Sequence, residues 1–196
     1  MKKLFLGLGL VAGTFAFAQS FGIKGGMNVS SLSNDGGLDD SKSKIGFNAG
    51  VFMNAPIAES FSIQPEVLYS QYGSKVESTV LGNKFSSARK LDYITVPVMF
   101  QYNATPAFYL EAGPEFGFLA SAKQKATGNN NSSITELNKD NFNTFNFGVG
   151  LGAGYYFTPN VGLTARYVAG FTDTYKDNNG DAIKNNVFQV GLAYKF

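Results

Sequence analysis

The chain has no cysteine, no histidine and no tryptophan among its 196 residues. Without cysteine, no disulfide can hold the fold together. Charged residues make up only 15% of the chain, against roughly 25% in soluble domains. A mean hydropathy of -0.06 leaves no apolar excess for a bundle of membrane-spanning helices, so that class is excluded. Glycine and phenylalanine are abundant instead, with 23 and 19 residues, in a chain long enough for one domain.

The first 18 residues have the three parts of a secretory signal peptide. Lys2 and Lys3 form the charged start, residues 4–15 form an apolar segment, and AFA at residues 16–18 fits the small-x-small cleavage pattern. The apolar segment is shorter than the ~20 residues of a spanning helix, which favours cleavage over an anchor. We expect a mature chain of residues 19–196. It carries 14 basic and 14 acidic residues, and a net charge of zero argues against nucleic acid or an anionic surface as a partner of the chain as a whole.

Eight segments of the mature chain alternate between apolar residues and small or polar ones. Successive side chains of a β-strand point to opposite faces, so a period of two predicts strands. The clearest is FNFGVGLGAGYYF at residues 145–157, where glycine fills most positions between the apolar residues. The predicted strands are residues 20–30, 44–55, 60–73, 91–103, 107–120, 142–157, 160–172 and 186–196.

The connections between these segments are alternately short and long. The long, polar connections are at about 31–43, 74–90, 121–141 and 173–185. Alternation of this kind is the topology of an up-and-down barrel in an outer membrane, with tight turns in the periplasm and long loops outside. The third long connection, at 121–141, is polar and low in aromatics, and we expect a mobile loop that either carries recognition or is merely tolerated.

The composition of the two faces favours a membrane barrel over a soluble sandwich or a lipocalin-like barrel. A soluble barrel would place a face rich in Lys, Glu and Thr in water, whereas here the polar faces hold mostly Gly, Ser and Asn. No apolar face contains a charge, as expected where a lipid-facing Lys or Arg costs about 2–4 kcal/mol. Tyrosines near the strand ends fit an aromatic girdle; they are Tyr69, Tyr102, Tyr155, Tyr167 and Tyr194. The sequence therefore predicts an all-β, eight-stranded antiparallel transmembrane barrel in a bacterial outer membrane, with lipid as its partner.

Three prolines, Pro65, Pro97 and Pro114, fall inside predicted strands. A closed barrel has no free edge, so each proline removes a ladder hydrogen bond unless a bulge absorbs it. Pro65 and Pro114 each precede a glutamate on the inward face. We expect bulges at these two positions, which could shift the facing of later residues.

Charged residues of the inward faces predict a network in the lumen. They are Lys24, Glu66, Glu111, Glu115, Arg166 and, near the base, Lys195. We expect Arg166 to pair with at least one of the three glutamates, because a buried charge without a partner is costly. A filled, non-conducting lumen is the favoured interpretation, and a gated ion path is the alternative.

The last predicted strand ends the chain on an aromatic residue. Its apolar face carries Phe188, Val190, Leu192, Tyr194 and Phe196. A final strand of this kind is similar to the assembly signal of outer-membrane barrels, which implies that the barrel-insertion machinery reads it.

Nothing in the sequence predicts catalysis or a cofactor. A common route to catalysis in enzymatic outer-membrane barrels uses a histidine for acid–base chemistry, and this chain has no histidine. Asp177, Asn179 and Asp181 could offer oxygens to calcium, but the sixth position is Ala182 and not the glycine of an EF-hand loop. We interpret this stretch as a turn and predict no metal site.

Several segments together resemble the PorT-like outer-membrane β-barrel domain family. The resemblance runs from GIKGGMNVSSLS through SIQPEVLYSQYGSK and LDYITVPVMFQY to FGVGLGAGYYF and VFQVGLAYKF, and covers nearly the whole mature chain. It implies an integral outer-membrane protein and little about activity. We expect a structural or surface-interaction role. The alternatives are a narrow porin-like channel for small solutes and an accessory part of a secretion assembly.

Overall fold

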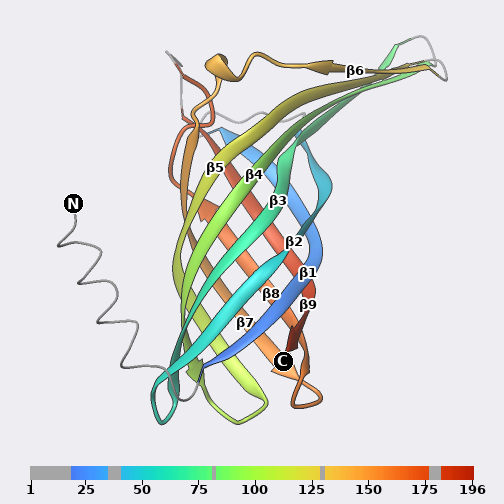
Figure 1. Cartoon of the computed structure of the whole chain (residues 1–196). Helices are drawn as coiled ribbons and strands as arrows, with labels where there is room; N and C mark the ends of the chain where they lie inside the picture. The colour runs from blue at the N-terminus through green and yellow to red at the C-terminus, as the bar shows by residue number, and fades with distance from the viewer. Residues whose placement is uncertain (1–18, 35–40, 81–82, 129–130, 177–181) are drawn as a thin grey trace.

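Strands paired in a closed ring form the wall of the molecule (Figure 1). The computed structural model describes residues 19–34, 41–80, 83–128, 131–176 and 182–196, so the predicted signal peptide and the calcium candidates Asp177, Asn179 and Asp181 lie outside the described residues. The strands are β1 Ser20–Asn34, β2 Ser41–Ala58, β3 Phe61–Val80, β4 Asn83–Asn103, β5 Phe108–Gly128, β6 Asn131–Glu136, β7 Phe145–Tyr156, β8 Val161–Gly170 and β9 Ile183–Lys195. A short 3-10 helix, η1, spans Lys139–Asn141.

Eight of these strands close the barrel, as the sequence predicts. The pairing order is β4-β3-β2-β1-β9-β8-β7-β5, every pair is antiparallel, and β4 pairs with β5 to close the ring. The one described strand outside the ring is β6, which pairs with β5 alone. In the described part of the chain, no helix has the length and hydropathy needed to cross a membrane.

The facing predicted from the alternation is confirmed. Leu151 and Leu192 expose 68% and 54% of their surface on the outer wall, whereas Arg166 and Gln189 are buried inside. Glycine, serine and amide residues suit this interior, because an eight-stranded barrel has room only for side chains. The apolar outer wall needs a lipid environment, since no soluble domain leaves so many large apolar residues in water.

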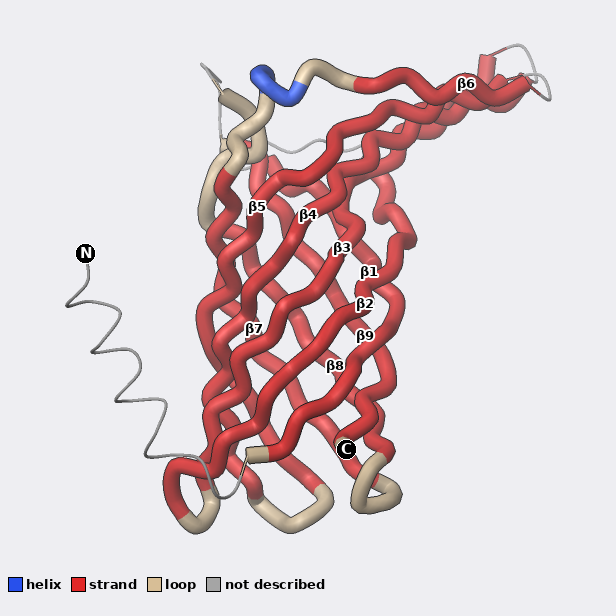
Figure 2. Tube along the Cα trace, in the orientation of Figure 1, coloured by secondary structure: helices blue, strands red, loops and turns tan. Residues whose placement is uncertain are grey.

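The short turns all lie at one end of the barrel (Figure 2). They join β2 to β3, β4 to β5, and β7 to β8, at the positions that the sequence predicts. Threonine hydroxyls stabilise two of them: Thr105 accepts from the backbone N–H of Phe108 and Thr158 from that of Val161, each at 2.9 Å. The C-terminus lies at the same end, where the N–H of Phe196 donates to the carbonyl of Phe21.

The prolines do not produce bulges, so the expectation for Pro65 and Pro114 is wrong. Pro65, Pro97 and Pro114 each stay in register with one neighbouring strand. On the other side, the ladder has a gap beside each proline and resumes in the same register. A residue in an antiparallel strand directs its N–H and C=O toward one neighbour, so a missing N–H interrupts one ladder only. The facing of Glu66 and Glu115 is therefore unchanged.

Two of the predicted long loops are largely strand, which corrects the boundaries expected at 74–90 and 121–141. β3 and β4 form a hairpin that continues beyond the barrel wall, and β5 pairs there with β6. We call the four-stranded sheet formed by residues 73–80, 83–90, 121–128 and 131–136 the outer sheet. It leans away from the barrel at the end opposite the short turns (Figures 1 and 2).

The outer sheet begins where the ladders are irregular. The β2–β3 register shifts between Ser43 and Asn48, and the β4–β5 register shifts between Asp92 and Tyr93. Gly73, on β3, has a φ of 130°, a backbone conformation that favours glycine. Bulges bend a strand and increase its twist, which accounts for the tilt of the sheet.

Candidate functional site

An arginine in the barrel interior binds two carboxylates. Arg166 of β8 donates from Nη1 and Nη2 to Glu66 Oε2 and Oε1 at 3.0 and 2.7 Å, and from Nε to Glu111 Oε1 at 2.7 Å. Lys24 Nζ lies 3.3 Å from Glu66 Oε1. All four side chains are buried. We call Lys24, Glu66, Glu111 and Arg166 the ion network; its two positive charges balance its two negative ones.

Glycines of β7 make room for the ion network. A Cβ on Gly150 would lie 3.3 Å from Arg166 Cδ and 2.9 Å from Met99 Cε. A Cβ on Gly152 would lie 3.0 Å from Glu111 Oε1. Contacts this short are unfavourable in a packed interior. The glycine alternation that marks this strand in the sequence therefore has a packing cause.

Amide side chains supply further hydrogen bonds to the two carboxylates. Gln64 Nε2 donates to Glu66 Oε1 at 2.8 Å, and Gln101 Nε2 donates to Glu111 Oε2 at 3.0 Å. Asn54 Nδ2 in turn donates to Gln101 Oε1 at 2.8 Å. Buried charges are tolerated when both ion pairing and hydrogen bonding are satisfied. The arrangement thus fits a fixed polar filling.

Glu115 lies outside the ion network, although it is one of the five lumen charges that the sequence predicts. Its Oε1 accepts from the hydroxyl of Tyr72 at 2.5 Å, while its Oε2 is buried without a hydrogen-bond partner. Among the described residues it has no ion pair. Gln189 Nε2 donates to the same Tyr72 hydroxyl at 3.5 Å. Glu115 therefore belongs to a separate site, in which its hydrogen-bond partner is uncharged.

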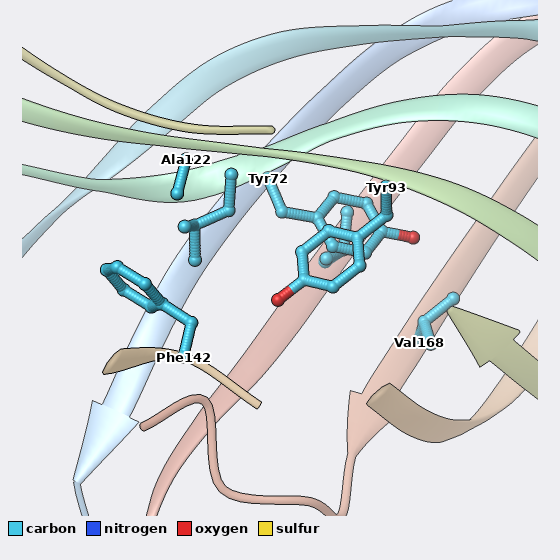
Figure 3. Packing of buried hydrophobic residues seen from close by; sticks show 7 residues of the cluster. Tyr72, Tyr93, Ala122, Phe142 and Val168 are labelled. Atoms are coloured by element: carbon cyan, nitrogen blue, oxygen red, sulfur yellow. The ribbon is translucent and has the colours of Figure 1, made fainter. Parts of the chain in front are cut away.

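An apolar cluster fills the interior near the outer end of the barrel. Its members are Tyr72, Leu91, Tyr93, Ala122, Phe142, Val168 and Val187. The two tyrosine rings lie 5.4 Å apart, and Phe142 enters from the segment between β6 and β7, extending toward Ala122 (Figure 3). The Phe142 ring also lies 5.1 Å from that of Tyr175. We call these seven residues the apolar plug.

Sequence reasoning missed the apolar plug and one further cation. The inward faces were expected to hold mostly Gly, Ser and Asn, although the alternation also placed Tyr93 there. Tyr72 and Val168 share inward parity with Glu66 and Arg166, and this parity was an available signal for the plug. Phe142 has the same inward parity as Asn146 in the predicted strand at residues 142–157, but the predicted boundary is wrong: β7 begins at Phe145, and Phe142 lies in the segment that precedes it. Lys44 is the missed cation: it is buried and donates from Nζ to the carbonyl of Tyr72 at 3.1 Å.

The remaining predicted residues lie on β9 or, for Phe196, directly after it. Lys195 places its Nζ 3.9 Å from the ring centre of Tyr156, near the short turns. The five apolar residues of the predicted assembly signal all face outward; they are Phe188, Val190, Leu192, Tyr194 and Phe196. In the part of the chain that the structure describes, no group of acidic residues is arranged to hold a metal ion.

Comparison with solved structures finds barrels of the same architecture. Neisserial surface protein A is similar with a TM-score of 0.54 and 16% identity, covering 91% of this chain and 99% of that one. Ail, the attachment invasion locus protein of Yersinia pestis, solved with the heparin analogue sucrose octasulfate, has a TM-score of 0.52 and 17% identity, covering 92% and 100%. At identities this low, the structural similarity shows a shared fold alone. A search of curated proteins gives no significant match.

The sequence profile of a protein family matches most of the chain, at residues 17–176. The family is described as "Outer membrane protein beta-barrel domain". This match agrees with the closed ring, the apolar outer wall and the polar interior, and the protein is accordingly located in the bacterial outer membrane, with lipid against that wall. The chain belongs to the outer membrane protein beta-barrel domain family.

Proposed function

We propose that the protein is a closed, non-conducting barrel whose outer sheet provides an interaction surface outside the cell. The observation that carries this proposal is the filling of the interior by two successive groups of buried side chains, the ion network and the apolar plug. A path for ions would require both groups to move. Moving Arg166 would leave Glu66 and Glu111 buried without their principal partner, at a cost of several kcal/mol.

The placement of the outer sheet supports the second half of the proposal. In outer-membrane barrels, short turns face the periplasm and long connections face outward. The outer sheet is at the end opposite the short turns (Figure 1), so it projects from the cell. Surface segments on a rigid scaffold are where recognition takes place, and no comparable structure exists at the periplasmic end of the described chain.

Conductance of the refolded protein in planar bilayers tests the closed lumen. We expect no discrete current steps, with insertion verified in the same sample by the mobility of the folded form on unheated gels. Stable, discrete conductance would contradict the proposal and support the narrow porin-like channel instead.

Two finer assignments belong to the same proposal. The outward-facing residues Phe188, Val190, Leu192 and Tyr194 of β9, together with Phe196 directly after it, form the signal that the insertion machinery reads, as their exposure on the wall allows. Strand order and the Pro65–Glu66 pair support the PorT-like resemblance. A role as an accessory part of a secretion assembly would appear as partner proteins retained when the barrel is isolated from native outer membranes.

A further inference from the structure

The two faces of the outer sheet differ in charge. The register pairs Lys90 directly with Lys123 and pairs Ala88 with both Lys75 and Lys125. Directly opposed residues share a face, so Lys75, Lys90, Lys123 and Lys125 lie on the same face of the sheet. The other face carries neutral residues and one cation, Arg89, whose Nη1 donates to the hydroxyl of Tyr175 at 2.5 Å. We call Lys75, Lys90, Lys123 and Lys125 the basic face.

The basic face continues the lipid-facing wall of the barrel. Ile94 and Phe118 are paired and exposed on the wall. Lys90 follows Ile94 on the same face of β4, four residues farther out, which is about 13 Å along a strand. Headgroup regions lie immediately outside the ~30 Å hydrocarbon layer. The lysines are thus positioned where lipid phosphates lie, and their long side chains can reach an interface.

The cross-strand pair of Lys90 and Lys123 is electrostatically unfavourable without a counter-ion. Lys90 and Lys123 are directly opposite on one face, and like charges in that position destabilise a sheet. Lys123 Nζ lies 3.6 Å from Glu136 Oε1, but the Glu136 side chain is 84% exposed, so the pair contributes little. Among the described residues, no ion pair joins Lys90 or Lys125 to a carboxylate, and the acids that the register places on this face are Glu77, Asp92 and Glu136. A bound anion would remove the repulsion.

We propose that the basic face binds the phosphate groups of outer-leaflet lipids and so anchors the outer sheet to the membrane surface. Continuity with the lipid-facing wall favours a lipid headgroup over a soluble polyanion. The inference rests on the proposed function only for the position of the sheet outside the cell. It does not depend on a closed lumen, so a conducting barrel would leave it intact, and a failure to bind lipid would leave the closed barrel intact.

The proposal is tested by a binding measurement on the refolded protein in zwitterionic nanodiscs. The ligand is fluorescently labelled lipopolysaccharide, either phosphorylated or dephosphorylated. The test variant is Lys90→Gln/Lys123→Gln, and the matched control is Lys139→Gln/Lys176→Gln, which removes the same charge from exposed positions outside the outer sheet. Each lysine near an anionic surface contributes to the free energy of binding, and the loss of two lysines should weaken lipopolysaccharide binding about 30-fold. We expect the test variant to lose affinity by this factor and the control to keep the affinity of the wild type. Removing the phosphates from lipopolysaccharide should lower the affinity of the test variant little further.

Several outcomes would overturn the proposal. Equal affinity of the test variant and the control would show that the basic face does not bind the lipid, as would equal affinity of the wild type for the two forms of lipopolysaccharide. Sucrose octasulfate serves as the soluble polyanion. If it bound the wild type as tightly as lipopolysaccharide, with the same loss in the test variant, the assignment to lipid would be wrong. Retention of the folded gel mobility by both variants verifies that binding and not folding is measured.

Discussion

Replacing Arg166 by methionine removes the cation that holds the interior together while keeping most of the side-chain volume. The change deletes three hydrogen bonds and leaves Glu66 and Glu111 buried with Lys24 as the one remaining cation of the ion network. Breaking a buried ion pair by removing one partner costs about 3–5 kcal/mol, because an uncompensated charge remains. We expect the free energy of unfolding to fall by that amount, measured by urea titration in lipid vesicles with the folded fraction read from gel mobility.

A compensating substitution makes this test specific. In Arg166→Met/Glu111→Gln, the remaining charges are Lys24 and Glu66, which lie within ion-pair distance and balance each other. The double variant should therefore recover most of the stability lost by Arg166→Met. If the single variant were as stable as the wild type, or the double variant no more stable than the single one, the ion network would not be stabilising the barrel.

Three further changes separate the parts of the account. Glu66→Gln should destabilise the barrel by about 3–5 kcal/mol, whereas Glu115→Gln should change stability little, because the Tyr72 hydroxyl keeps an acceptor and no cation loses its partner; equal effects in urea titration would contradict this. Phe142→Ala should lower stability by about 3–5 kcal/mol through loss of buried aromatic volume, and an unchanged unfolding midpoint would show that the apolar plug is not packed. Phe196→Ala should reduce the amount of folded barrel in native outer membranes while refolding in vitro stays normal; normal insertion in cells would argue against the assembly signal.

The barrel was predictable because a period of two leaves little freedom. Once Leu151 and Leu192 face lipid, the residues that alternate with them along their strands face the lumen. The alternation of short and long connections then sets the topology. The same parity placed Glu66, Glu111 and Arg166 on the inner wall. Their meeting in space follows from the small bore, since charged side chains in a narrow barrel must reach one another.

Features that depend on residues distant in sequence were not predictable. The separation of Glu115 from the ion network depends on Tyr72 reaching it from another strand. Phe142 has inward parity in the predicted strand at residues 142–157, but the structure places it in the segment before β7, and no local pattern shows that this segment folds back over the lumen. The outer sheet was missed because its strands are polar on both faces, so Lys90 and Lys123 give no alternation to detect. The prolines were misjudged because an interrupted ladder needs no bulge when one neighbour keeps the register.

Access of water to the interior tests the closed barrel most directly. Thr164 is buried in the lumen, and the natural chain has no cysteine, so Thr164→Cys introduces a single small thiol there. Ser133→Cys, on the exposed strand β6, is the matched accessible site. In the protein reconstituted in vesicles, a water-soluble thiol reagent should modify the cysteine at 133 rapidly and leave the one at 164 unmodified until the barrel unfolds. Modification of both at similar rates would show an open aqueous lumen and contradict the account.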